Sequence, residues 1–106
     1  MTTTLEKIRK YLKTLRFYYS NQAECDRLFR FIPHDVTNLV KTYSDMIRTA
    51  PLDLYLLYCE LYVNGSTQEA AAEQFDFSTE YVRKRNKALL EYFQSKFEEE
   101  NRRNVV

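Results

Sequence analysis

The sequence predicts an all-α protein of one domain. Glycine occurs once and proline twice in 106 residues, too rarely for the turns of a β protein. Strong helix formers such as Leu, Glu, Lys and Ala recur at helical spacing along the chain. Between residues 66 and 93, two helical patterns are separated by a short turn. We therefore expect a small helical domain in which N-terminal helices pack against a C-terminal helix pair.

The first helix is expected from Leu5 to Ser20, with Thr4 as its N-cap. Apolar residues at 3-4-3-4 spacing form one stripe, composed of Leu5, Ile8, Leu12, Leu15 and Tyr19. Basic residues occupy the other faces, namely Lys7, Arg9, Lys10, Lys13 and Arg16. We favour packing of this helix on its own domain. The alternatives are a coiled-coil-like dimer seam and a basic surface that contacts phosphate.

Residues 21–32 predict a second helix, or an extension of the first, that ends before Pro33. Its expected apolar contacts are Leu28, Phe29 and Ile32. Asp35 is expected to cap a third helix with a buried stripe of Val36, Leu39, Val40, Tyr43 and Ile47. His34, in the loop between these helices, is expected to make a local hydrogen bond.

The segment Thr49-Ala50-Pro51 breaks the chain, with Pro51 expected as the first helical residue and Asp53 in the first turn. The next helix, residues 52–63, is apolar on nearly every side. We therefore predict that it is central, with the C-terminal helix pair on one side and the N-terminal helices on the other. Asn64-Gly65 is expected to close it.

The C-terminal helix pair begins at a predicted capping box of Ser66 and Glu69, which starts a helix from Gln68 to Phe75. Small alanines at positions 70–72 favour a close helix crossing.

A turn of Asp76, Phe77 and Ser78 is expected to follow this helix. Asp76 tolerates left-handed geometry, Phe77 is expected to tuck inward, and Ser78 suits the N-cap of the next helix.

The next helix has two distinct faces at about 100° per residue. One face is expected to pack and consists of Val82, Asn86, Leu89 and Phe93. The other is polar and consists of Glu80, Arg83, Lys84 and Lys87. The helix is expected to continue through Phe97 towards a polar end, where the apolar pattern stops.

This segment resembles the helix-turn-helix in the fourth conserved region of bacterial sigma factors, and small phage and prophage regulators built on that region. The residues that fit the family pattern in register are Glu69, Ala72, Phe75, Phe77, Ser78, Val82, Arg83 and Arg85. Asp76 stands where the family usually has Gly, and Asn86 where it usually has an apolar residue. The resemblance covers residues 52–95 and implies a DNA-binding module.

The resemblance also implies which residues contact DNA. The helix from Ser78 to Lys87 would enter the major groove, with base contacts from Thr79, Glu80, Arg83 and Lys84. Thr67 and Gln68 would hold backbone phosphate, and Lys87 and Arg85 would add charge. The predicted DNA-binding residues are therefore Thr67, Gln68, Ser78, Thr79, Glu80, Arg83, Lys84, Arg85 and Lys87.

The distribution of charge is more informative than the net charge of +1. Residues 1–50 carry nine Lys and Arg against five Asp and Glu, or +4, and residues 51–106 carry seven against ten, or −3. Within this acidic half, residues 83–87 have the sequence RKRNK, which concentrates positive charge where a recognition helix would meet DNA.

Several function classes are not expected. A single histidine, a single glycine and two isolated cysteines, Cys25 and Cys59, offer no catalytic constellation, phosphate loop or zinc site, so we predict a non-enzyme without a cofactor or metal. The cysteines are typical of reduced, buried thiols. No stretch of about 18 consecutive apolar residues occurs. We therefore predict a soluble, cytoplasmic protein that does not bind membranes.

These observations favour a sequence-specific regulator of transcription that binds double-stranded DNA, of phage or mobile-element origin. A homodimer through the N-terminal helices is expected, because one such module buries little DNA surface. Residues 1–50 would serve packing and dimerisation, 51–97 DNA binding, and 98–106 would form a polar tail. The alternatives are a module that docks on RNA polymerase or a sigma factor without binding DNA, and a ring-forming DNA-recognition subunit of a phage packaging machine.

Overall fold

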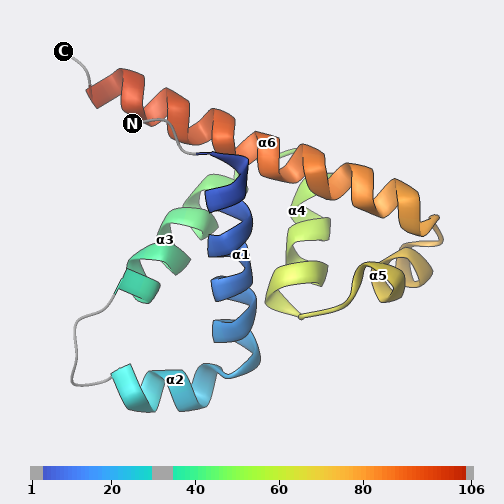
Figure 1. Cartoon of the computed structure of the whole chain (residues 1–106), viewed down its shortest axis with the longest axis horizontal. Helices are drawn as coiled ribbons and strands as arrows, with labels where there is room; N and C mark the ends of the chain where they lie inside the picture. Colours follow the sequence, from blue (N-terminus) through green and yellow to red (C-terminus); the bar gives the residue numbers. More distant parts are fainter. Residues whose placement is uncertain (1–3, 30–34, 105–106) are drawn as a thin grey trace.

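The structure, a computed structural model, describes residues 4–29 and 35–104. These residues form six α-helices and one π-helical segment and contain no strand, which confirms the all-α class (Figure 1). The elements are α1 (Leu5–Ser20), α2 (Gln22–Phe29), α3 (Asp35–Ile47), α4 (Leu52–Tyr58), the π-helix η1 (Cys59–Val63), α5 (Gln68–Phe75) and α6 (Thr79–Asn104). The longest helix, α6, extends across the whole molecule (Figure 1). Helices α1, α3 and α4 each contact α6, and α3 also contacts both α1 and α4.

The first helix has the predicted bounds because its cap forms as expected. The Thr4 Oγ1 accepts a hydrogen bond of 3.1 Å from the Lys7 amide. Ile8, Leu12 and Leu15 have no exposed surface, which confirms that the apolar stripe packs within its own domain. The stripe is thus occupied by intramolecular contacts and does not present a free dimer seam.

The next segment forms a separate helix, α2, because the amide of Asn21 bonds back to the carbonyls of Phe17 and Tyr18 and closes α1. The predictions for Pro33 and His34, and for the side chains of Leu28, Phe29, Ile32 and Asp35, lie outside the described residues. In α3, Tyr43 and Ile47 are buried as predicted, and Met46 joins them.

The helix predicted as central forms as α4 and continues directly into η1. Pro51 is the N-cap of α4 and not, as expected, its first helical residue. The Asn64 amide bonds to the Cys59 carbonyl over 2.8 Å, and Gly65 follows with a positive φ of 74° that ends the helix as predicted. The α4–η1 segment contacts α1, α3, α5 and α6, which confirms its central place. One face is nevertheless not fully covered, because Leu52, Tyr55 and Leu56 remain exposed.

Two clusters of buried side chains hold the helices together. The larger joins α1, α3, α4 and α6 through Ile8, Leu12, Leu15, Tyr43, Met46, Ile47, Leu54, Tyr58, Leu89, Leu90 and Phe93. Its centre contains an edge-to-face contact of 4.7 Å between the rings of Tyr43 and Phe93. The smaller fixes α5 against η1 and α6 through Leu57, Leu61, Ala71, Ala72 and Val82. Both clusters include α6, so the C-terminal helix pair is anchored on the N-terminal helices.

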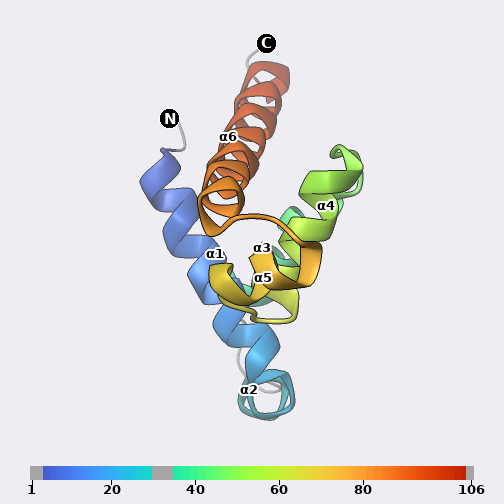
Figure 2. The ribbon, with the colours of Figure 1, turned by 90° about the vertical axis from the view of Figure 1, so that its right-hand side faces the viewer.

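The polar segment after Phe97 extends α6 as a helix as far as Asn104. Arg102 and Arg103 lie in its last turn, where cations are favoured by the helix dipole. Viewed along α6, α5 and the start of α6 form one end of the molecule, with α1 and α4 to either side (Figure 2).

Candidate DNA-binding surface

The N-cap of α5 lies one residue later in the chain than predicted. Thr67, and not Ser66, is the N-cap, and its Oγ1 accepts a bond of 3.1 Å from the Ala70 amide. The predicted capping box is therefore wrong. The reason is a competing partner, since the Ser66 hydroxyl donates to the Glu60 Oε1 over 2.6 Å and ties the loop to η1. The bounds of α5 are as predicted.

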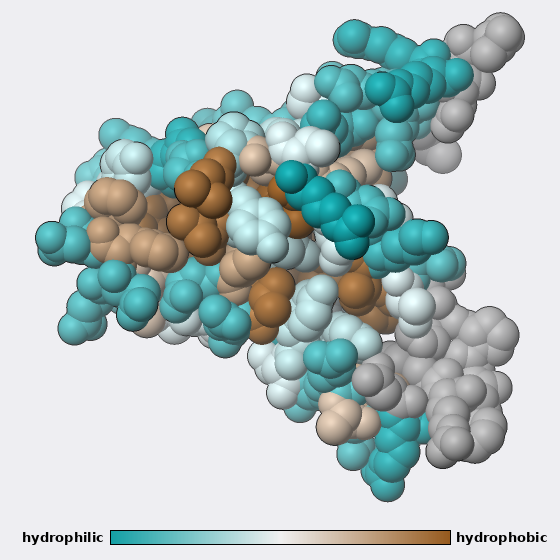
Figure 3. All heavy atoms as spheres, turned by 180° about the vertical axis from the view of Figure 1, so that it is seen from behind, coloured by the Kyte–Doolittle hydropathy of each residue, from teal (hydrophilic) through white to brown (hydrophobic). Residues whose placement is uncertain are grey.

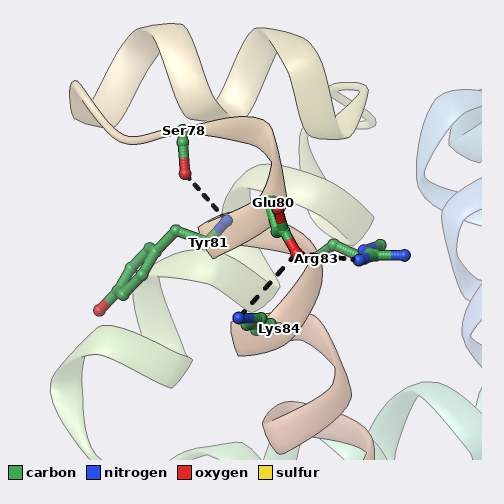
Figure 4. A network of polar contacts seen from close by, with 5 residues as sticks. All are labelled: Ser78, Glu80, Tyr81, Arg83 and Lys84. Carbon is green, nitrogen blue, oxygen red and sulfur yellow. Dashed lines mark hydrogen bonds and ion pairs between the residues drawn. The ribbon is translucent and has the colours of Figure 1, made fainter.

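The turn between α5 and α6 is shaped by Asp76, which adopts left-handed geometry at φ 60° and ψ 44°, as predicted. Ser78 caps α6, because its Oγ accepts from the Tyr81 amide over 3.1 Å (Figure 4). Phe77 does not tuck inward, so that prediction is wrong. Half of Phe77 is exposed, because its ring packs against the rings of Phe75 and Tyr81 and is not among the buried residues of the small cluster.

The inner face of α6 is as predicted, with Val82, Leu89 and Phe93 buried. Asn86 on this face has a specific partner, the Tyr62 hydroxyl, which donates to the Asn86 Oδ1 over 2.6 Å. Burial raises the pKa of Tyr62, and the bond to Asn86 and the charges of Arg9 and Arg16 partly oppose that rise. A polar residue is tolerated here because η1 supplies its donor.

The outer face of α6 presents Arg83, Lys84 and Lys87 to solvent. Glu80 lies between two of them, with its Oε1 at 3.4 Å from the Arg83 Nη2 and 4.0 Å from the Lys84 Nζ (Figure 4). Both basic side chains are about 70 % exposed, and ion pairs of this kind contribute only about 0–1 kcal/mol. A phosphate or a base edge could therefore replace Glu80 as their partner at small cost. Glu80 itself must release both cations before it contacts a base.

Arg85 is separated from these cations. Its Nη2 forms an ion pair with the Asp53 Oδ2 of α4, and only 34 % of its side chain is exposed. The helix rotates by about 100° per residue, so Arg85 faces α4 while Arg83 and Lys87 face away from it. The structure thus does not bring Arg85 together with the other predicted DNA-binding residues.

A basic residue that was not among the predicted contacts completes the surface. Arg9 of α1 lies with Arg83, Lys84 and Lys87 of α6 around a hollow of about 510 Å³, which Gln68 and Asn86 also line. Four of these six lining residues are cationic and none is acidic. We call these six residues the basic hollow. The available signal in the sequence was the basic side of the first helix, which was one alternative for a surface that contacts phosphate. It did not distinguish Arg9 from Lys7, Lys10, Lys13 and Arg16.

The hollow is held together by contacts between α1 and the loop that precedes α5. The Arg16 Nη2 donates to the Gly65 carbonyl over 2.7 Å, and α1 packs closely along η1. Because Gly65 leads directly into Thr67 and Gln68, this bond fixes the start of α5 relative to Arg9.

The remaining predicted residues lie on the rim of this end of the molecule. Thr67 and Ser78 are exposed, but each hydroxyl already accepts a backbone amide, so each is left to donate to a further partner. Thr79 is exposed in the first turn of α6. The arrangement thus offers cations and hydroxyl donors, the groups that hold phosphate oxygens.

Two further observations on the described part of the chain concern metals and membranes. No group of three or more His, Cys, Asp or Glu residues is placed to hold a metal. Within the same residues, no helix has both the length and the apolar character needed to cross a bilayer. Cys25 is buried and Cys59 partly buried, both are free thiols, and burial raises the pKa of the Cys59 thiol.

Comparison of the chain with protein-family models, with curated proteins and with solved structures gives no match. The resemblance to the sigma-factor helix-turn-helix therefore rests on the residues of this chain alone.

Proposed function

We propose that this protein is a sequence-specific regulator of transcription that binds double-stranded DNA with α5 and α6. The observation that carries the proposal is the basic hollow, where four cations from α1 and α6 converge and no lining residue is acidic. Glu80 pairs with two of these cations, but only through exposed contacts of 3.4 and 4.0 Å. Such local concentration of positive charge is the electrostatic requirement for binding a phosphate backbone. It accompanies two helices joined by a short capped turn, which supports the proposed helix-turn-helix.

In this proposal the first turns of α6 lie in the major groove. Thr79, Arg83 and Lys84 point outward from these turns and would reach base edges. Arg9, Gln68 and Lys87 lie further back around the hollow and would hold the phosphates beside the groove. Arg85 has a structural role, because its partner is Asp53 of α4.

The proposal is tested by selecting DNA that binds the whole chain from random oligonucleotides and titrating the selected fragment at several salt concentrations. The wild type should bind it more tightly than a scrambled fragment. The double variant Arg83→Ala/Lys84→Ala should bind more weakly and show a salt slope lower by about one unit for each phosphate that it no longer neutralises.

The matched control is Arg102→Ala/Arg103→Ala, which removes the same charge from exposed positions in the last turn of α6. It should bind nearly as the wild type does. An equal decrease in affinity for the two variants would mean that only net charge matters, and no salt-dependent binding by the wild type would refute the proposal. In that case docking on RNA polymerase without DNA binding becomes the better hypothesis.

A further inference from the structure

A second hollow lies on a different side of α6 and is apolar. It has a volume of about 210 Å³ and is lined mainly by Leu56, Leu57, Phe75, Phe77, Tyr81 and Val82. We call it the apolar groove. Apolar side chains gather on this face over the end of the molecule that contains α4, α5 and the start of α6 (Figure 3).

The groove lies beside a ridge of the same character. Leu52, Tyr55 and Leu56 occupy one face of α4 at i, i+3, i+4 spacing. These three residues, with Phe77 and Tyr81, have between 39 % and 71 % of their surface exposed. With about 200 Å² for each fully exposed large side chain, they present on the order of 500 Å² of apolar surface. This is as large as the largest apolar patches of ordinary monomers, about 300–600 Å², which are often functional.

We propose that a second copy of this chain covers the apolar groove and forms a twofold dimer. A twofold interface requires one surface that is complementary to itself. This face offers such a surface, because the exposed Leu52 and Tyr55 of α4 adjoin an apolar groove that Leu56 lines. Each copy would place the ridge residues Leu52 and Tyr55 against the groove of the other.

The charges on this face are compatible with self-association. The charged residues that line the groove are Asp53 and Arg85, and they form an ion pair with each other. Two copies can therefore meet here without repulsion between unpaired like charges. A symmetric contact through the basic hollow would bring like charges together and would be opposed by their repulsion.

The apolar area available for contact indicates whether the dimer is obligate or reversible. Two apolar faces together supply about 1,000 Å², which is below the standard size of specific protein interfaces and about the minimum for a biological one. We therefore expect a reversible dimer rather than an obligate one.

The dimer would leave the DNA-binding surface free. Figure 4 shows Tyr81 and Arg83 pointing to different sides of α6, so covering Tyr81 does not cover Arg83. The inference goes beyond DNA binding and does not depend on it.

The test is sedimentation equilibrium of the whole chain without DNA, from low micromolar to near-millimolar concentration. The wild type should show a reversible monomer–dimer equilibrium. Leu52→Glu should weaken it by about tenfold or more, because a buried charge would replace a central apolar contact. Leu52 is 71 % exposed, so the variant should keep its fold, which circular dichroism would verify.

Phe17→Glu is the matched control, since Phe17 is an equally exposed apolar residue on α1, outside the groove. It should dimerise as the wild type does. Tyr55→Glu provides a second substitution on the same ridge if Leu52→Glu does not fold. A wild type that is monomeric throughout, a ring larger than a dimer, or a dimer unaffected by both ridge variants would overturn the proposal. Since no DNA is present, none of these results bears on the DNA-binding proposal.

Discussion

At the scale of single residues, the polar pair of Tyr62 and Asn86 explains how α6 accommodates a polar side chain on its packing face. The Tyr62 hydroxyl donates to the Asn86 Oδ1 over 2.6 Å, and both side chains are partly buried. A buried acceptor that loses its donor keeps its desolvation cost without the compensating bond. The pair should therefore behave as a unit.

The prediction concerns Tyr62→Phe, which removes the donor and should lower the free energy of unfolding by about 1–2 kcal/mol. The double variant Tyr62→Phe/Asn86→Leu should recover most of this stability, because both polar groups are then gone. Urea unfolding of the four species in the cycle measures the coupling. If the effects of the two substitutions simply add, the hydrogen bond does not hold α6 against η1.

Single residues also show which features of the structure could be predicted from the sequence and which could not. The cap of α1, the left-handed turn at Asp76 and the Ser78 cap were predicted correctly, because each depends on neighbouring residues alone. The exposure of Phe77 and the pairing of Arg85 with Asp53 depend on what another helix supplies at that point in space. Periodicity places a side chain on a face of its helix, but it does not say which element meets that face.

At the scale of elements, the bounds of a helix depend on local sequence, whereas its contacts depend on where the other helices lie. The bounds of α1 and α5 were predicted from local sequence, although the N-cap of α5 is Thr67 and not the predicted Ser66. Local sequence did not predict that α1 would bring Arg9 to α6, because that depends on how α1 lies along η1 and on the Arg16 bond to Gly65. The candidate DNA-binding surface is thus built by three elements, of which the sequence pattern identified two.

This arrangement predicts that α1 contributes directly to DNA binding. Arg9→Ala should weaken binding of the selected DNA and lower the salt slope by about one unit, because the variant neutralises one phosphate fewer. Lys10→Ala is the neighbouring control, since Lys10 lines a different hollow between α1 and α3. Fluorescence anisotropy titrations of both variants at several salt concentrations would make the comparison. Equal effects would mean that α1 acts only through general charge.

At the scale of the whole molecule, the helices depend on one another through a core that contains buried tyrosines. Tyr43 and Tyr58 are buried, and Tyr62 is partly buried. Burial raises the pKa of all three phenols, with smaller contributions from Tyr11 at Tyr43 and from Tyr19 at Tyr58. These side chains come from α3, α4 and η1, so their protonation state is linked to the integrity of the fold.

The direction of these pKa shifts predicts that the protein becomes less stable at alkaline pH. A phenol whose pKa is raised in the folded state stays neutral there while the unfolded chain loses its proton. The contribution of each phenol to stability is complete below the unfolded pKa of about 10 and is lost as pH rises above it. Thermal unfolding followed by circular dichroism should show a melting temperature that falls over this range, together with cooperative appearance of tyrosinate absorbance.

Tyr43→Phe separates this effect from general alkaline damage. The Tyr43 hydroxyl is buried and has no hydrogen-bond partner among the described residues, so its removal should cost little stability at neutral pH. The variant should lose less stability than the wild type as pH rises. Tyr81→Phe, which removes an exposed hydroxyl, should follow the wild-type curve. If Tyr43→Phe also follows that curve, ionisation of this core phenol is not what unfolds the protein.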